Sequence, residues 1–384
     1  MYKYFLNKCI EKIQNDKTRT IIIIFLIVIT SSLSLYFISN NEILYSKPIA
    51  RIISVNDEES KKEDSNGKTE RIKSQKIQAV ILNGIYKGKT VELNNISSFS
   101  QANDLDLKVN DEVFISITDN ANSQINSAKI LEFKRDTYVI YILNIFIVLI
   151  ILIGRFKGFK SLVSVVVNIL ILLAVIKLFT QGFDLLFLSI IASILFVTLS
   201  ILIVSGLNKK TVSAIAGTLI GTLLSVLIAG IVIKLNNWSG IHFEEMEFLT
   251  HPPEKIFFIE LIIGTLGGIM DIAISISSAI EELYDKNPNI QRKAVINSAR
   301  EIGQDIMGTM ANTLVFAYLS GSIPTILLLL RNGIPITYII NFNLSLEFMR
   351  ALIGSIGIVL SIPITIFTSI IILKKQMIGE IVKS

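Results

Sequence analysis

The chain has 384 residues, of which 51% are hydrophobic and only 17% are charged, and its formal net charge at pH 7 is +5. A soluble protein of this length would carry more charge, and apolar stretches of about twenty residues recur, each long enough to cross a bilayer core of about 30 Å. The composition therefore excludes an ordinary soluble fold and predicts an α-helical polytopic membrane protein. Most Lys and Arg residues lie in short loops beside the apolar runs, where they act as topology signals, so the positive charge does not indicate a nucleic-acid partner.

About eight transmembrane helices are predicted. For the first, a cleaved signal peptide is the alternative, but its apolar run is long and no small-residue cleavage site stands out, so we interpret it as an uncleaved anchor. The predicted spans are Thr20–Ser39, Tyr138–Gly154, Ser161–Phe179, Leu185–Ser205, Val212–Ile233, Ile256–Ile280, Ile306–Leu330 and Phe348–Leu373.

The basic residues predict the orientation. They fall at alternate ends of the spans, so all of them lie on one side if both termini are cytoplasmic. This pattern is typical of a multi-pass protein of a bacterial-type plasma membrane. Three regions follow: a cytoplasmic N-terminus with the anchor (1–39), an extracytoplasmic domain (40–137) and a seven-helix transmembrane bundle (138–384). The residues that carry the signal include Lys17, Arg19, Arg155, Lys157, Lys209, Lys210, Arg292, Lys293, Lys374 and Lys375.

The segment between the first two spans has the alternation of a small all-β domain, either OB-like or a sandwich. Its charged stretch Asn56–Lys76 is predicted to loop. A rigid cap on the membrane bundle is the favoured interpretation, because no aromatic or charged cluster marks a binding surface; a domain that handles a substrate or partner is the alternative. Short strands are predicted at Ile77–Leu82, Thr90–Leu93, Val113–Thr118 and Ser127–Phe133.

Asp271 is the most informative residue of the membrane part. It lies inside the apolar run Phe257–Glu282, where an ionised carboxylate costs about 2.5–3.5 kcal/mol. Small and polar residues recur around it at three- and four-residue steps, which places them on one face of a helix. We interpret Asp271 as a proton or small-cation site. The alternative is a protonated carboxyl that hydrogen-bonds another helix and only holds the bundle together. The residues of this face are Gly264, Gly268, Asp271, Ser275, Ser278 and Glu282.

The depth of Asp271 within its predicted span indicates which residues lie near it. It lies about 15 Å from the inner end of its span, at 1.5 Å per residue. Asn312 in the seventh span and Asn168 in the third come out at a similar level, with Thr309 nearby, so a layer of these side chains is expected. Gly267 and Gly268 would let a helix or water approach, and Glu281 and Asp305 stand at the inner surface.

Two further segments are distinctive. Residues 289–305 have helical spacing and predict a cytoplasmic amphipathic helix near the inner membrane face. An outer loop holds both histidines of the chain. His242, His251 and Glu244 are weak metal candidates there, but their spacing matches no established motif, so a solvated acidic loop is favoured.

Motifs for common chemistry do not occur. The chain has no phosphate-binding glycine loop, no GxSxG and no HExxH. We therefore expect no cofactor and no enzymatic activity. A membrane-embedded enzyme that uses Asp271 with Glu281 or Asp305 is disfavoured because the latter two lie at the inner surface.

Three stretches carry a family resemblance: GRFKGFKSLVSVVVNILIL, GGIMDIAISISSAIEEL and NSAREIGQDIMGTMANTL. Together with the anchor and the outer β segment, they resemble the YibE/F-like membrane proteins over most of the chain. More distantly, Gly268–Ser320 is similar to the paired core helices of SecD/SecF and resistance-nodulation-division transporters. That resemblance implies coupling of a proton gradient to export, although this chain has two more spans and a smaller outer domain.

The leading hypothesis is an ion-coupled, proton-dependent membrane transporter or export factor whose substrate the sequence does not reveal. The alternative is a non-transporting scaffold that presents the β domain to a partner. The lipid bilayer and a proton or small cation are the expected partners, and a homo-oligomer fits either hypothesis.

Overall fold

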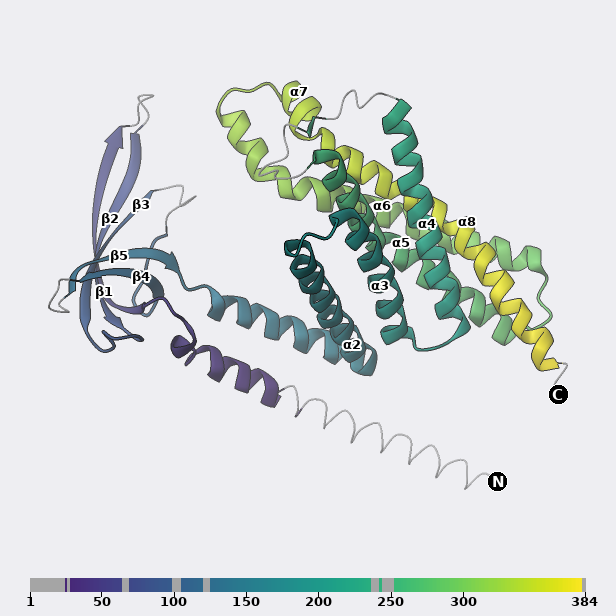
Figure 1. Ribbon diagram of the computed structural model, residues 1–384, viewed down its shortest axis with the longest axis horizontal. Coiled ribbons are helices and arrows are strands. Elements are labelled where there is room, and N and C mark those ends of the chain that lie inside the picture. Colours follow the sequence, from purple (N-terminus) through teal and green to yellow (C-terminus); the bar gives the residue numbers. More distant parts are fainter. Residues whose placement is uncertain are drawn as a thin grey trace. The chain divides into compact units, whose positions relative to one another are not determined.

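The computed structural model describes residue 25 and residues 28–63, 69–98, 105–119, 125–235, 242–243 and 252–381. Its contacts divide the chain into two compact units, Met1–Arg155 and Phe156–Ser384, each of which is described by itself (Figure 1). The first unit contains a five-stranded sheet, and the second consists of long helices.

The strands of the first unit form one antiparallel sheet in the order β3-β2-β1-β4-β5. The edge strands β3 and β5 also approach one another, as in a partly open barrel. Its core is aliphatic, with Ile52, Ile77 and Ile115 essentially inaccessible to solvent. An apolar helix, Val28–Ile38, and a short 3-10 helix, η1 (Glu42–Leu44), precede the sheet. The strands are β1 (Ile49–Glu63), β2 (Thr69–Ile81), β3 (Thr90–Ser98), β4 (Glu112–Asp119) and β5 (Ile125–Phe133).

Composition predicted a loop for the charged stretch Asn56–Lys76, but its described residues, 56–63 and 69–76, are strands. They form the outer parts of β1 and β2, which pair from Val55↔Ile77 to Glu63↔Thr69. Opposite charges meet across or beside this hairpin: Lys76 lies 2.9 Å from Glu58, and Lys73 lies 2.7 Å from Asp57. Cross-strand pairs of this kind stabilise a strand that is polar on both faces. The strands β1 and β2 therefore pair in a segment whose charge content alone indicates a loop.

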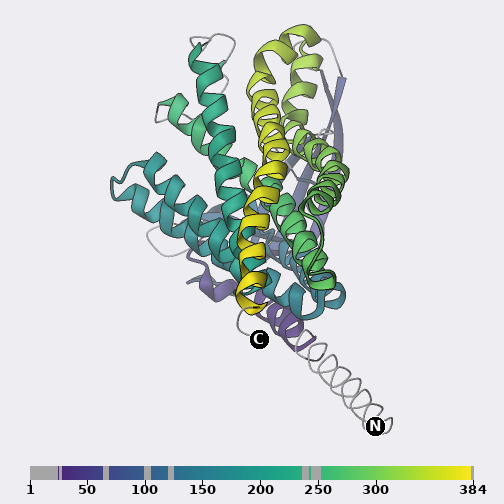
Figure 2. The same ribbon diagram turned by 90° about the vertical axis from the view of Figure 1, so that its right-hand side faces the viewer.

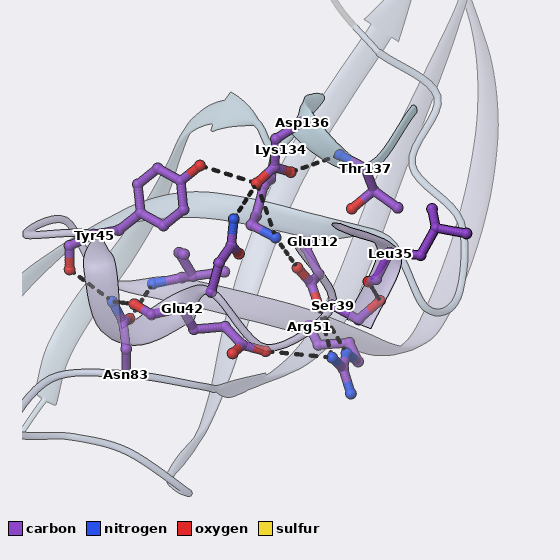
Figure 3. Close-up of polar contacts among 12 residues, drawn as sticks. Leu35, Ser39, Glu42, Tyr45, Arg51, Asn83, Glu112, Lys134, Asp136 and Thr137 are labelled. Carbon is purple, nitrogen blue, oxygen red and sulfur yellow. Dashed lines mark hydrogen bonds and ion pairs between the residues drawn. The ribbon is translucent and has the colours of Figure 1, made fainter. Parts of the chain in front are cut away.

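A polar junction joins η1, the sheet and the start of helix α2 (Asp136–Thr180) (Figure 3). The buried ammonium of Lys134 lies 2.8 Å from Glu112 and 3.3 Å from Asp136. The Asp136 carboxylate also accepts hydrogen bonds from Asn41 (2.8 Å) and Tyr45 (2.9 Å). Burial lowers the pKa of Lys134, but the contacts with both carboxylates outweigh it and raise the pKa overall. Lys134 therefore stays charged and holds the three elements together.

We expect Lys134→Ala to lower the free energy of opening of the sheet by about 3–5 kcal/mol, because Glu112 and Asp136 lose their buried counter-charge. Hydrogen exchange of β4 and β5 in the full-length protein, followed by mass spectrometry, measures this opening. Lys129→Ala removes an exposed lysine from the same sheet and should change exchange by less than about 0.5 kcal/mol.

The same contact predicts a pH dependence. Because the pKa of Lys134 is raised in the folded protein, its stabilisation is complete below the ordinary lysine pKa of about 10.4 and is lost as the pH rises through the folded value. The difference between wild type and Lys134→Ala should therefore shrink in the alkaline range, and on acidification only once the pH falls to the lowered pKa of Asp136. A difference that shrinks on acidification alone would contradict this assignment.

The helices that follow are α3 to α8. Six helices in the described residues are long and apolar enough to cross a membrane: α2, α3, α4, α5, α6 and α8. α2 has 45 residues and consists of two helices that meet at a kink, enough residues for two spans of a bilayer core at 1.5 Å per residue. Arg155 interrupts it with φ 48° and ψ −128°, between the second and third predicted spans. The other bounds are α3 (Leu185–Ser205), α4 (Lys209–Leu235), α5 (Pro253–Lys286), α6 (Arg292–Arg331), α7 (Ile336–Tyr338), the π-helical turn η3 (Ile339–Asn343) and α8 (Ser345–Ile381).

Small residues bring α4, α5 and α8 together, as Figures 1 and 2 show for α4 and α8. A side chain at Gly217 of α4 would collide with Thr365 of α8. A Cβ at Gly357 of α8 would lie 2.7 Å from Ile269 of α5. The hydroxyl of Ser225 donates a hydrogen bond to the carbonyl of Ile353 at 2.8 Å. Close backbone approach through such residues is the usual way in which membrane helices pack.

The predicted amphipathic segment 289–305 is not a separate helix. α6 begins at Arg292 and runs without a break to Arg331, through the start of the seventh predicted span. Val295, Ala299 and Gly303 are its buried residues, and they recur every fourth position on one side. This buried side lies in the first part of α6, and no turn separates the two predicted segments.

Gly217→Ala should destabilise the bundle by about 1–3 kcal/mol, since the added methyl group overpacks the contact with Thr365. Thermal unfolding of the purified protein in detergent, followed by circular dichroism, measures the change. Gly308→Ala in α6 is the matched control, because nothing lies within 4 Å of the added methyl group. Equal losses in both variants would exclude the packing explanation.

Candidate functional site

Asp271 lies near the middle of α5, and the neighbouring helices leave it exposed. Among the described residues, its carboxylate has no hydrogen bond or ion pair. The nearby hydroxyl of Ser275 donates to the backbone carbonyl of Asp271 at 2.8 Å rather than to the side chain. An unpaired carboxylate at this depth is costly, which is why such groups usually face water or serve a function.

A second charged residue, Glu260, lies on the same face of α5, and residue spacing alone did not predict its ion pair. Arg350 of α8, whose side chain is 11% exposed, bridges Glu260 of α5 at 2.5 Å and Glu347 at 2.6 Å. Its guanidinium also lies 5.9 Å from the ring centre of Phe257. Two carboxylates share one guanidinium here, so the cluster can accept a proton or a small cation.

Tyr318 of α6 extends this cluster toward the middle of α5. Its buried hydroxyl has no hydrogen-bond partner within the described structure, and it lies within electrostatic reach of Arg350 and Glu260. Gly264 makes room for this hydroxyl, because any side chain there would collide with it. Eleven residues separate Glu260 from Asp271, about 17 Å and a whole number of turns. Both carboxylates therefore share one side of α5.

Charged pairs also mark the other end of α5. Glu281 lies 2.5 Å from Lys210 at the start of α4, and Glu282 lies 2.7 Å from Lys286. Ser278 is partly exposed one turn before this end. Asp271 is thus the unpaired carboxylate between two paired ends.

The structure does not bring Asn168 and Asn312 to Asp271. The amide of Asn168 donates instead to the hydroxyl of Ser200 in α3 at 2.9 Å. This pair lines a cavity of about 350 Å³ together with Gly267, one turn from Asp271. Asn168 is therefore on the correct side of α5, but bonded elsewhere.

Asn312 and Thr309 are exposed on α6, as are Asp305 and Gly308. The contact of α6 with α5 runs through Leu314, which meets the position of Gly268. Two residues turn a helix by about 200°, so Asn312 faces away from α5. The sequence predicted the depth of Asn312 in the membrane, but not the rotation of α6 about its own axis.

The histidine loop adds no metal centre to the described part of the chain. The ring of His242 lies 4.2 Å from that of Phe342, whereas His251 and Glu244 lie outside the described residues. Among the described residues, no three His, Cys, Asp or Glu side chains are grouped as metal ligands. A metal site in this loop stays a hypothesis.

Comparison with protein families assigns both units. Residues 142–375, which include the whole of α5 and α8 up to 375, match the YibE/F-like protein family, and residues 43–133 match the YibE/F family N-terminal domain. The chain belongs to the YibE/F-like family. Searches of curated proteins and of solved structures found no match, so the expected similarity to SecD/SecF and resistance-nodulation-division cores is not supported.

Arg350→Met should destabilise this YibE/F-like protein by about 3–5 kcal/mol, because it leaves two carboxylates without a counter-charge. Adding Glu260→Gln and Glu347→Gln to the same chain should restore much of the loss. Thermal unfolding in detergent measures both effects. Arg331→Met, which removes an exposed arginine, is the control and should change little. Failure of the glutamine substitutions to restore stability would show that Arg350 acts through packing alone.

Proposed function

We propose that this YibE/F-like protein is a proton-coupled membrane transporter or export factor, with Asp271 as the coupling site. In this proposal it lies in a bacterial plasma membrane, crosses it eight times and has both termini in the cytoplasm. The observation that carries the proposal is a polar face that extends along α5 through its apolar run. The residues of this face are Glu260, Gly264, Gly267, Gly268, Asp271, Ser275, Ser278 and Glu281.

The arrangement of charges supports a path for protons. Near its two ends the carboxylates are paired, Glu260 with Arg350 and Glu281 with Lys210. Asp271 between them is unpaired and can load and release a proton. Gly267 leaves space at the cavity that Asn168 and Ser200 line together with apolar side chains, and in this proposal water enters there to reach α5. The tyrosine hydroxyl at Gly264 and the serines on the other side lie between the carboxylates.

The outer domain fits the role of a cap. We propose that it is an OB-like barrel, since its strand order and the approach of β3 to β5 are those of a five-stranded barrel. The buried Lys134 junction joins the sheet to the start of α2 within the first unit, and the proposed cap uses this junction as its attachment.

A scaffold or assembly role is the second candidate, and the exposed polar side of α6 favours it. Asp305, Thr309 and Asn312 face away from the helices that α6 contacts. Polar side chains are costly against lipid and commonly join helices of different chains. In this alternative the chain assembles with a second copy or a partner, tolerates Asp271→Asn, and loses its partner when residues 40–136 are removed.

Asp271→Asn in reconstituted vesicles tests the leading proposal. Wild-type protein should dissipate an imposed pH gradient, recorded with a trapped pH-sensitive dye, and Asp271→Asn should reduce the flux to that of protein-free vesicles. Asparagine keeps the size and hydrogen bonding of the side chain but carries no exchangeable carboxyl proton.

Asp285→Asn is the matched control, because it makes the same chemical change at an exposed position near the end of α5. It should leave the flux intact. Equal fluxes in wild type and Asp271→Asn would contradict the coupling role, and an absence of flux from all three proteins would favour the scaffold.

A further inference from the structure

A groove between α6 and α8 carries an inference that does not depend on the proposed transport. It has a volume of about 510 Å³. Its floor consists of Ile362 and Ile366 of α8, which are almost completely buried. Val359 and Phe367 stand at its walls with 49% and 58% of their surface exposed. The groove is thus apolar and open toward the surroundings of the bundle.

Two arginines border this apolar groove. Arg292 and Arg300 of α6 line it together with Gln304, and both arginines are exposed. Among the described residues, neither makes an ion pair. At the end of α5, Glu281 binds Lys210 and Glu282 binds Lys286, and Asp285 makes no ion pair with either arginine. The groove therefore offers two guanidinium groups that no carboxylate of the described chain neutralises.

Both arginines border the same groove although they are eight residues apart in α6. This spacing is about 12 Å along the helix and about 80° around it. Long basic side chains extend to the membrane surface while their stems stay in apolar surroundings.

We propose that this groove binds an anionic phospholipid. Arg292 and Arg300 hold the phosphate of the headgroup, Gln304 contributes a hydrogen bond, and an acyl chain lies against Ile366 and Phe367. Guanidinium groups bind phosphate oxygens in pairs, and basic pockets between membrane helices are typical sites for anionic lipid headgroups.

The lining favours a lipid over a soluble anion or a peptide. A soluble phosphate would use only the arginines and leave the apolar length of the groove empty. The exposed Val359 and Phe367 lie within the apolar stretch of α8 that is long enough to cross a membrane, where acyl chains are the abundant apolar ligand. A lipid with a negative headgroup can contact both the arginines and the apolar lining of the groove.

Native mass spectrometry of the full-length protein in detergent tests the proposal. The protein is titrated with phosphatidylglycerol and, separately, with phosphatidylcholine of the same acyl chains. We expect about tenfold tighter binding of phosphatidylglycerol, and the loss of this preference in Arg292→Gln/Arg300→Gln. Val359→Trp, which fills the groove without changing a charge, should weaken binding of phosphatidylglycerol to a similar extent.

Matched controls decide between a site and general surface charge. Lys286→Gln/Lys293→Gln removes two neighbouring exposed charges outside the groove, and Val212→Trp adds the same bulk on an exposed part of α4. Both should keep the preference. The proposal is overturned if the lysine control loses as much as the arginine variant, if the two lipids bind equally, or if inorganic phosphate displaces the lipid completely. Where the arginine variant does not fold by circular dichroism, Val359→Trp alone decides.

Discussion

The rotation of α5 is the constraint on which the membrane unit depends. One side of this helix carries isoleucines, including Ile269, Ile272 and Ile276, which are completely buried against α8 and its neighbours. Burial of this side gains free energy only because small residues let the helices approach closely, and it fixes how α5 is turned. The opposite side carries Asp271, which is exposed, whereas Gly264 and Gly268 on that side meet Tyr318 and Leu314 of α6. A carboxylate in that position is the cost of the arrangement and the basis of the function proposed for it.

The charges along α5 differ in a way that its packing explains. Glu260 meets Arg350 because α8 runs beside α5, and Glu281 meets Lys210 because α4 starts next to the end of α5. No basic side chain of the described residues reaches Asp271, which lies about midway between these two carboxylates. A helix that only supported its neighbours would gain nothing from a carboxylate in that position. Asp271 is not among the residues that line the groove between α6 and α8, so the lipid binding proposed there and the proton coupling proposed at Asp271 can be tested separately.

Periodicity predicted much of the fold but not the contacts between distant elements. The polar face of α5 follows from three- and four-residue spacing, and Glu260 belongs to it by the same rule. Its partner Arg350 stands ninety residues later, and only the position of α8 reveals the pair. Asn312 was predicted at the correct depth but on the wrong side of α6, because depth depends on residue count and rotation depends on packing. In the sheet, the charged composition of residues 56–76 predicted a loop, because composition does not show which charges the strand register brings close together.

The proposed coupling role of Asp271 requires that water reaches the polar face of α5. Single cysteines introduced at Asp271, Ser275 and Ser278, in a chain whose only natural cysteine is replaced by Cys9→Ser, can be tested with a charged, membrane-impermeant thiol reagent in vesicles. The proposal predicts rapid modification at these positions and none at Leu227 of α4, which is exposed but lies among apolar residues. Protection of all three polar positions, or equal modification of Leu227→Cys, would contradict it.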